Sequence, residues 1–176
     1  MKKEAFWAEQ YRRHIGKMVG ACYRYVADWD LAEDLAQDAF LAAMEKASTF
    51  RAFGSFEGWL KKIAINQALM HLRDCPETVE WDENLHGQEA EEEADEQHLP
   101  QTEFSQEELL ETIGKLPVKQ RTVFNLYAVE HYPHSKIAET LGISVANSKV
   151  LLTRARAELQ QRLKVVARKR ELAVSS

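Results

Sequence analysis

Residues 133–163 read PHSKIAETLGISVANSKVLLTRARAELQQRL, and this stretch decides the fold of the C-terminal part of the chain. Its spacing predicts a helix-turn-helix whose first helix runs from about His134 to Leu141. Gly142 stands where a chain leaving a helix favours a left-handed residue, and Ser144 can cap the helix that follows. The second helix then carries one inward-facing stripe at i, i+4, i+7 and i+11, formed by Ser148, Leu152, Ala155 and Leu159.

The opposite face of this second helix is polar and basic. It presents Asn147, Lys149, Val150, Thr153, Arg154 and Ala157. Lysine, arginine and asparagine beside small apolar side chains suit the major groove of DNA, which predicts a recognition helix. The same spacing also fits a surface helical hairpin whose basic face is only solvated, and spacing alone leaves that alternative open.

The composition is that of a helical protein. The 176 residues suffice for one ordinary domain or two small ones, 45% are hydrophobic, and only four are proline and seven glycine. No apolar run has the length of a membrane span and nothing resembles a signal peptide, so we expect a cytoplasmic protein with no membrane insertion of its own. Cys22 and Cys75 lack zinc-ligand spacing and are expected to be free thiols.

The net charge of −5 hides three segments of different sign. Between Asp74 and Gly114 there are 15 acidic residues and no lysine or arginine, whereas residues 115–176 hold 12 bases and 4 acids. Residues 1–73 are nearly neutral, with 11 bases and 9 acids. A basic module is the expected footprint of phosphate binding. The acidic segment predicts a flexible connector, either a solvated tether or a segment that folds over the basic module and competes with DNA.

Three helices are predicted in the N-terminal part. Helical spacing places them from Ala5 to about Val26, from near Leu31 after a break at Asp28–Asp30, and from Phe56 or Gly58 to Cys75–Pro76. The expected core residues are Phe6, Tyr11, Ile15, Met18, Val19, Cys22, Tyr23, Val26, Leu35, Phe40, Leu41, Met44, Trp59, Ile63, Leu69 and Met70. The second helix turns an acidic face outward, formed by Glu33, Asp34, Gln37 and Asp38.

An aromatic loop, STFRAFGSFEG, separates the second and third helices. It holds three phenylalanines beside Arg51, and the helix after it carries two lysines and Asn66. Aromatic faces that stack bases, next to cations that follow the backbone, suit single-stranded nucleic acid and can border a pocket for a flipped base. Aromatic residues at a helix junction are more often core, and composition alone favours that alternative.

Two separate stretches resemble one known family. The run AEDLAQDAFLAAMEKASTF, followed by FEGWLKKIAINQALMHLR, resembles region 2 of bacterial RNA polymerase sigma factors of the small extracytoplasmic-function (ECF) group, within the sigma-70 family. The run LPVKQRTVFNLYAVEHYPHSKIAETLGISVANSKVLLTRARAEL resembles their region 4. The resemblance implies an all-α fold of two small helical modules: a region 2 bundle at 1–75, an acidic flexible linker at 76–104 and a region 4 helix-turn-helix module at 105–170.

The resemblance also implies a function. It is that of an alternative sigma factor, which binds core RNA polymerase and directs promoter-specific initiation by recognising the −10 and −35 elements and melting the DNA. Such a chain is not an enzyme and needs no cofactor and no metal. The implied partners are core polymerase, through the clamp of the β′ subunit and the flap of the β subunit, promoter DNA, and an anti-sigma factor.

Three sets of residues match functional positions of the family. The helix that docks on the polymerase clamp is matched by Asp34, Leu35, Gln37, Asp38 and Phe40. The part that opens the −10 element and holds a flipped base is matched by Phe50, Arg51, Phe53, Ser55, Trp59, Lys61, Lys62, Asn66 and Arg73. The −35 surface is matched by Ser144, Asn147, Lys149, Val150, Thr153, Arg154 and Arg156, of which Arg156 suits phosphate or intramolecular contacts better.

Departures from the family pattern gather around the helix-turn-helix. Ser148 occupies an expected apolar core position, Leu151 replaces a frequent arginine, and Lys136 stands where glutamate is usual. These changes predict a different preferred −35 element, in which Val150 and Thr153 favour thymine methyl groups.

Two other classes of protein compete with a sigma factor. A stand-alone regulator would use the helix-turn-helix together with the N-terminal module as a sensor or dimerisation domain. The docking pattern and the aromatic loop favour the sigma factor over it. An enzyme is disfavoured because the sequence has no Ser/His/Asp set, no metal-ligand cluster and no phosphate-cradling glycine loop.

Overall fold

The computed structural model of the chain describes residues 1–51, 53–75 and 103–175, and nearly all of these residues are helical. They form no strand, which confirms the predicted all-α class. The chain divides into two compact units, Met1–Val79 (unit 1) and Glu80–Ser176 (unit 2). The acidic linker expected at 76–104 lies almost wholly outside the described residues, and the module bounds 1–75 and 105–170 stay predictions.

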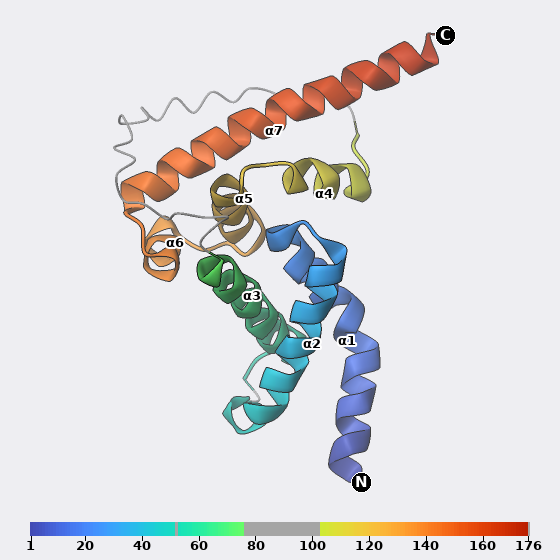
Figure 1. Ribbon diagram of the computed structural model, residues 1–176, viewed down its shortest axis with the longest axis vertical. Coiled ribbons are helices and arrows are strands. Elements are labelled where there is room, and N and C mark those ends of the chain that lie inside the picture. The colour runs from blue at the N-terminus through green and yellow to red at the C-terminus, as the bar shows by residue number, and fades with distance from the viewer. Residues whose placement is uncertain (52, 76–102, 176) are drawn as a thin grey trace. The chain divides into compact units, whose positions relative to one another are not determined.

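Unit 1 is a bundle of three helices, each of which packs against the other two (Figure 1). They are α1 (Lys2–Val26), α2 (Trp29–Glu45) and α3 (Phe56–Asp74), with a 3-10 turn, η1 (Ala47–Thr49), after α2. Caps fix the starts of α2 and α3: the Asp28 carboxylate accepts a hydrogen bond from the Leu31 amide, and the Ser55 hydroxyl accepts one from the Gly58 amide. Because of the first cap, α2 begins two residues earlier than its apolar spacing predicts.

The core face of α2 is built from smaller side chains than we predicted. Its buried stripe is Ala32, Ala36, Ala39 and Ala43, at i, i+4, i+7 and i+11, joined by Leu35 and Phe40. The prediction that Leu41 and Met44 are core residues is wrong, because they are 61% and 42% exposed. A stripe of alanines allows neighbouring helices to approach closely, and the larger side chains then lie at the edge of the interface.

The buried face of α1 is also rotated from the predicted one. Trp7, His14 and Tyr25 are buried beside the predicted Met18 and Cys22. The other predicted core residues of α1 are either exposed (Phe6 and Tyr11) or half-buried (Ile15, Val19, Tyr23 and Val26). On α3, Ile63 and Leu69 are buried as predicted, Trp59 is half-buried, and the prediction for Met70 is wrong because its side chain is exposed.

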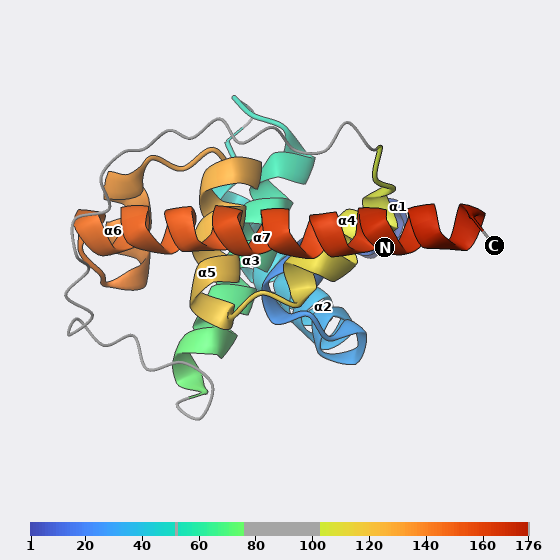
Figure 2. The same ribbon diagram turned by 90° about the horizontal axis from the view of Figure 1, so that it is seen from above.

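Unit 2 is organised around one long helix. Its elements are α4 (Gln106–Gly114), α5 (Val118–Phe124), the π-helical turn η2 (Asn125–Val129), α6 (His134–Leu141) and α7 (Val145–Val174). The 30-residue α7 packs against α4, α5 and α6, and in Figure 2 it runs straight across them. Leu116, Ala155 and Leu159 form the centre of this packing. The unit therefore presents α7 on a small, fixed support.

The far end of α7 is tied back to the start of α4. The Arg170 guanidinium donates to the backbone carbonyl of Glu103 at 2.9 Å, pairs with the Glu108 carboxylate, and lies 5.7 Å from the centre of the Phe104 ring. The hydrogen bond from Arg170 and those from Ser105 hold the pKa of Glu108 below its ordinary value. Ser105 and Glu108 also form a capping box at the start of α4.

Candidate nucleic-acid interface

Residues 134–174 form the predicted helix-turn-helix. α6 ends at Gly142, which adopts the left-handed conformation with φ 67°, and the hydroxyl of Ser144 accepts a hydrogen bond from the Asn147 amide at 3.0 Å to begin α7. The bounds predicted for the first helix, His134 to Leu141, are confirmed. Ser144 thus has a structural task at the start of α7, whatever else its side chain contacts.

One face of α7 is buried against the other helices of unit 2. The predicted stripe of Ser148, Leu152, Ala155 and Leu159 is confirmed, since all four side chains are less than a tenth exposed. Leu151 also belongs to the buried face, where an apolar side chain is well accommodated. The stripe continues through Leu163 and Ala167.

The opposite face of α7 is exposed and cationic. Lys149, Thr153 and Arg156 follow one another at i, i+4 and i+7, and Arg154 is exposed beside them. The remaining predicted contact residues, Asn147 and Val150, are half-buried. A straight, basic helix face of this kind has the dimensions and charge that a major groove accepts.

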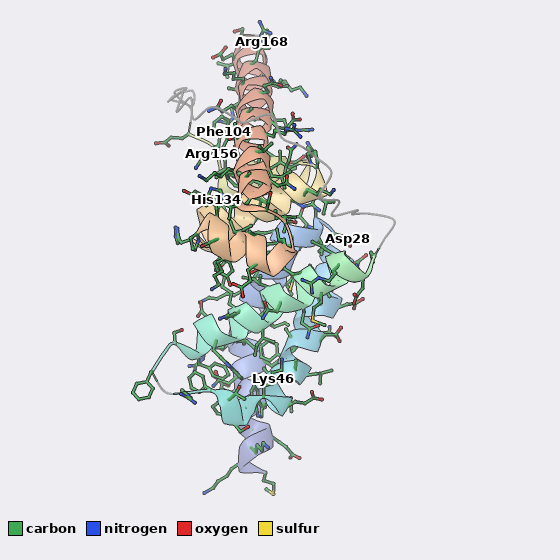
Figure 3. The ribbon with its side chains drawn as sticks, turned by 90° about the vertical axis from the view of Figure 1, so that its left-hand side faces the viewer. Asp28, Lys46, Phe104, His134, Arg156 and Arg168 are labelled. Carbon is green, nitrogen blue, oxygen red and sulfur yellow. The ribbon has the colours of Figure 1, made fainter. Side chains whose placement is uncertain are left out.

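Arg156 differs from the other cations because it is held by its own unit. Its guanidinium lies 5.6 Å from the centre of the Tyr127 ring, which faces it from η2. Tyr127 also contacts His134, whose imidazole stacks on the tyrosine ring with ring centres 4.7 Å apart. His134 and Arg156 lie at the α6 end of α7 (Figure 3). This placement agrees with the expectation that Arg156 makes intramolecular contacts.

Sequence reasoning missed Tyr127 and His134 as parts of this surface. Tyr127 lies in a π-helical turn, where the Glu130 amide donates to the carbonyl of Asn125, five residues back. No sequence pattern announces such a turn. The signal for His134 was available in Ser148, a polar residue at a core position, because a buried hydroxyl needs a partner.

Lys136, the other departure from the family pattern, also finds a partner. Its ammonium group lies 3.9 Å from the centre of the Tyr132 ring. Tyr132 lies just before α6 and Lys136 lies in its first turn, so the lysine contacts its own unit.

In unit 1 the exposed face of α2 carries the predicted acidic patch. Glu33, Asp34, Gln37 and Asp38 are all exposed. Two of the five residues matched to polymerase docking lie elsewhere, since Leu35 and Phe40 are buried at 6% and 4% exposure. These two side chains position α2 in the bundle, whereas Asp34, Gln37 and Asp38 are available to a partner.

A groove between α1 and α2 borders the acidic patch. It is lined by Tyr11, Ile15, Gly16, Val19, Trp29, Glu33 and Gln37. Trp29 is 53% exposed and stacks on Tyr23 with ring centres 3.8 Å apart. The sequence places this tryptophan in a predicted helix break and gives no sign of its exposure. A half-exposed, rigidly stacked tryptophan beside acidic side chains extends the patch with an apolar contact surface.

The aromatic residues around the α2–α3 loop divide into packed and exposed ones. Phe56 is the centre of a cluster whose rings lie between 5.5 and 6.0 Å from its own, formed by Phe6, Trp7, His14, Phe50 and Trp59. Phe53 is fully exposed. Phe50 and Trp59 therefore belong largely to the packed cluster, and Phe53 is the loop aromatic with a free face.

The loop and α3 also carry the polar residues that match the −10 element. Arg51, Lys62, Asn66 and Arg73 are exposed, and Lys61 is half-buried. Ser55 is engaged as the cap of α3. The start of α3 is further held by Glu57, which pairs with Lys17 at 2.7 Å and lies 3.6 Å from His14 Nδ1. The hydrogen bond from Lys17 lowers the pKa of Glu57.

The described residues hold no group of three His, Cys, Asp or Glu side chains that could bind a metal ion. Cys22 and Cys75 form no disulfide; burial raises the pKa of Cys22 to about 12, while Cys75 is half-buried at the end of α3, with its sulfur 3.6 Å from His71 Nε2. Within the described ranges, none of the helices combines the length and the apolar character that crossing a membrane requires.

Comparison with known proteins assigns the two units to one family. Residues 10–75 match sigma-70 region 2, and residues 106–159 match sigma-70 region 4. The chain is 30% identical over 156 residues to the ECF RNA polymerase sigma factor SigW of Bacillus subtilis, covering 84% of this chain and 83% of that protein. It is 29% identical over 163 residues to the RNA polymerase sigma-H factor of Pseudomonas aeruginosa, covering 86% and 83%.

A solved structure shares the fold. The sigma factor RpoE of Bartonella quintana, determined in complex with the anti-sigma factor NepR, matches with a TM-score of 0.54 and 19% identity, over 90% of this chain and 96% of that one. The two matched regions follow one another along the chain as the two helical units do. The alignments with the two relatives extend over 83% of the length of each. This chain therefore belongs to the sigma-70 family of RNA polymerase sigma factors, within the ECF group.

Proposed function

We propose that this chain addresses core RNA polymerase to its promoters by a division of labour between its two units. Unit 2 recognises the −35 element as duplex DNA, and unit 1 docks on the polymerase and captures the −10 element as single strand. The proposal rests on exposed surfaces whose charge or aromatic character suits these partners. Unit 2 exposes the cationic face of α7, and unit 1 exposes the acidic face of α2 and the Phe53 loop.

The upstream contact rests on the exposed side chains of α7. Lys149 and Arg154 are cations with long reach, and Thr153 adds a methyl group suited to thymine. The Thr153 hydroxyl donates a hydrogen bond to the backbone carbonyl of Lys149 at 3.1 Å, and this bond fixes the orientation of the threonine side chain. Arg156, placed over Tyr127, is left for a nearby phosphate.

The downstream contact rests on the loop before α3. An unpaired base can stack on the free face of Phe53, while Arg51 and Lys62 neutralise the strand backbone. The packed cluster around Phe56 supports this loop from below, so its role is positioning. Melting then follows from preferential binding to the open strand.

The polymerase contact rests on Asp34, Gln37 and Asp38. Their carboxylates and amide form an exposed patch on a helix whose other face is locked into the bundle. We assign the clamp of the β′ subunit to this patch and the flap of the β subunit to unit 2. An anti-sigma factor is a further proposed partner, because the Bartonella quintana sigma factor of the same fold forms such a complex.

Asp38→Arg tests the polymerase contact. We expect the variant to lose co-purification with core polymerase, since a cation replaces an exposed carboxylate without touching the core. Glu9→Arg is the control, because it makes the same charge change at an exposed position of α1. Glu9 forms only weak surface pairs with Arg12 and Arg13, so this variant should assemble normally. Equal assembly of both variants, each with unchanged helicity, would contradict the assignment of α2 as the docking face.

A further inference from the structure

One polar link connects the two helices of the helix-turn-helix. The Nδ1 atom of His134, the first residue of α6, lies 2.9 Å from the hydroxyl oxygen of Ser148 on α7. Ser148 is completely buried, on the same face of α7 as the buried Leu152 and Ala155. A hydrogen bond therefore joins the two helices within an otherwise apolar contact.

The surroundings of His134 are aromatic and cationic. Tyr127 from η2 stacks on one face of the imidazole. Burial and then the positive charges of Lys149 and Arg156 on α7 lower the pKa of His134 from its ordinary value of 6.5. The groups that shift this pKa thus all disfavour the imidazolium, and the ring is neutral at neutral pH.

The two cations that repel a proton from His134 are members of the proposed DNA-binding face. When phosphates approach Lys149 and Arg156, they offset these positive charges. The electrostatic cost of a third positive charge at His134 then falls. Proton binding at the histidine and phosphate binding at α7 should therefore favour each other.

We propose that His134 is a proton-linked positioning residue for upstream DNA: it ties α7 to α6 through Ser148 and takes up one proton when α7 binds. This inference rests on the proposed function of α7. The link to Ser148 survives protonation, because the imidazolium donates from Nδ1 to the hydroxyl oxygen. The hydroxyl proton can then turn to the carbonyl of Ser144, one helical turn back.

The direction of the effect follows from the charges. In the free chain the pKa of His134 lies below its ordinary value of 6.5, so unit 2 loses stability as the pH falls through that value. With DNA the pKa of His134 rises, so the affinity for DNA increases as the pH falls below neutrality. Uptake of one proton limits the increase to about tenfold for each pH unit.

Fluorescence anisotropy of the full-length chain with labelled duplexes tests the inference. Two probes are used, a duplex of mixed sequence and one recovered from a randomised pool by selection with the chain. Affinity should rise as the pH is lowered from about 8 to about 6, the range over which histidines titrate. His134→Gln, which keeps a hydrogen-bonding group beside Ser148, should bind with little pH dependence.

His131→Asn is the matched control. His131 is exposed, lies three residues before His134 and has φ 57°, a conformation that asparagine tolerates. It should keep the full pH dependence. Ser148→Ala removes the link but keeps the imidazole, and should lower the affinity at every pH while the dependence remains.

Three results would overturn the assignment of the proton to His134: a flat profile of the wild type, an unchanged profile of His134→Gln, or a profile abolished by His131→Asn. The proposed function fails separately if selection enriches no sequence although the mixed duplex binds. If neither duplex binds at any pH, the DNA-binding face and the inference fail together.

Nuclear magnetic resonance gives an independent reading of the same proton. Titration of the His134 ring signals in the full-length chain, free and bound to the selected duplex, should show a higher pKa in the complex. An unchanged pKa on binding would contradict the inference even if the affinity itself varied with pH.

Discussion

Arg154 and Arg156 lie two residues apart on α7 and have different surroundings. Arg154 is exposed, whereas the guanidinium of Arg156 lies over the ring of Tyr127. An exposed guanidinium can reach base edges in a groove. A guanidinium that stacks on a ring of its own unit can contact only DNA groups that come close to that ring. At the scale of single residues, Arg154 is therefore the stronger candidate for sequence readout.

We expect Arg154→Ala to weaken binding to the preferred upstream element by about 1–3 kcal/mol if the guanidinium contacts a base. The loss should be greatest on that element and smaller on mixed-sequence DNA. Arg168→Ala, which removes the same charge from an exposed position farther along α7 (Figure 3), is the control and should bind almost normally. Equal losses for both variants would mean that α7 contributes only general electrostatic attraction.

Phe53 is the residue that distinguishes strand capture from simple packing. Its ring is fully exposed, whereas the neighbouring Phe50 packs on Phe56 and Trp59. Phe53→Ala should leave polymerase assembly intact and reduce permanganate reactivity of thymines in the downstream element, since about 1–3 kcal/mol of base stacking is lost. Met70→Ala truncates another exposed apolar side chain of unit 1 and should not change the reactivity. Normal melting by Phe53→Ala would remove the ring from the mechanism.

The residue types predict which surfaces are charged, but they do not predict which groups each side chain contacts. The exposed acidic patch and the basic face of α7 were predictable because charged residues repeat at helical spacing. Helical spacing also predicts that Leu35 and Phe40 face the core, and their burial confirms it. The family resemblance alone places the same two residues among the polymerase contacts, because it marks positions without separating contact from support. A polar residue at a core position indicates that Ser148 needs a hydrogen-bond partner, but the sequence does not identify His134 as that partner, because the two residues are 14 positions apart.

At the scale of elements, unit 1 depends on a turn between α1 and α2 that contains an unusual residue. Ala27 ends α1 in the left-handed conformation, with φ 53° and its amide bonded to the carbonyl of Tyr23. Glycine is the ordinary choice at such a position because a β-carbon is strained there. The adjacent Asp28 then caps α2, so one short connection both ends and begins a helix.

Ala27→Gly should stabilise unit 1 by about 0.5–1 kcal/mol, as relief of left-handed strain exceeds the added flexibility of the unfolded chain. Ala8→Gly, in the exposed interior of α1, should destabilise it by about 1 kcal/mol. Urea unfolding followed by tryptophan fluorescence measures the free energy, because Trp7, Trp29 and Trp59 all lie in unit 1. A loss of stability in Ala27→Gly would show that the alanine is not strained.

The elements themselves were more predictable than their faces. Helix existence and most ends followed from apolar spacing, caps and Gly142. The alanine stripe of α2 was not predicted, because large apolar residues were expected in the core. In the structure the alanines are buried, and Leu41 and Met44 are exposed. The π turn η2 and the continuation of α7 to Val174 have no local sequence signal of comparable strength.

At the scale of the whole molecule, two units with separate cores carry separate surfaces. We propose that the cationic helix of unit 2 binds duplex DNA, and that unit 1 uses its acidic helix for a protein and its aromatic loop for single-stranded DNA. The proposed contribution of the chain is to choose where polymerase starts. This choice requires both units on one promoter, because each surface alone recognises a short element.

Run-off transcription tests this account most directly. Purified core RNA polymerase is supplied with fragmented genomic DNA of the host, with and without the chain, and transcript starts are mapped. We expect new, discrete start sites that share an upstream and a downstream element and appear only with the chain. Identical transcripts in both reactions, with DNA binding by the chain intact, would contradict it and favour a stand-alone regulator.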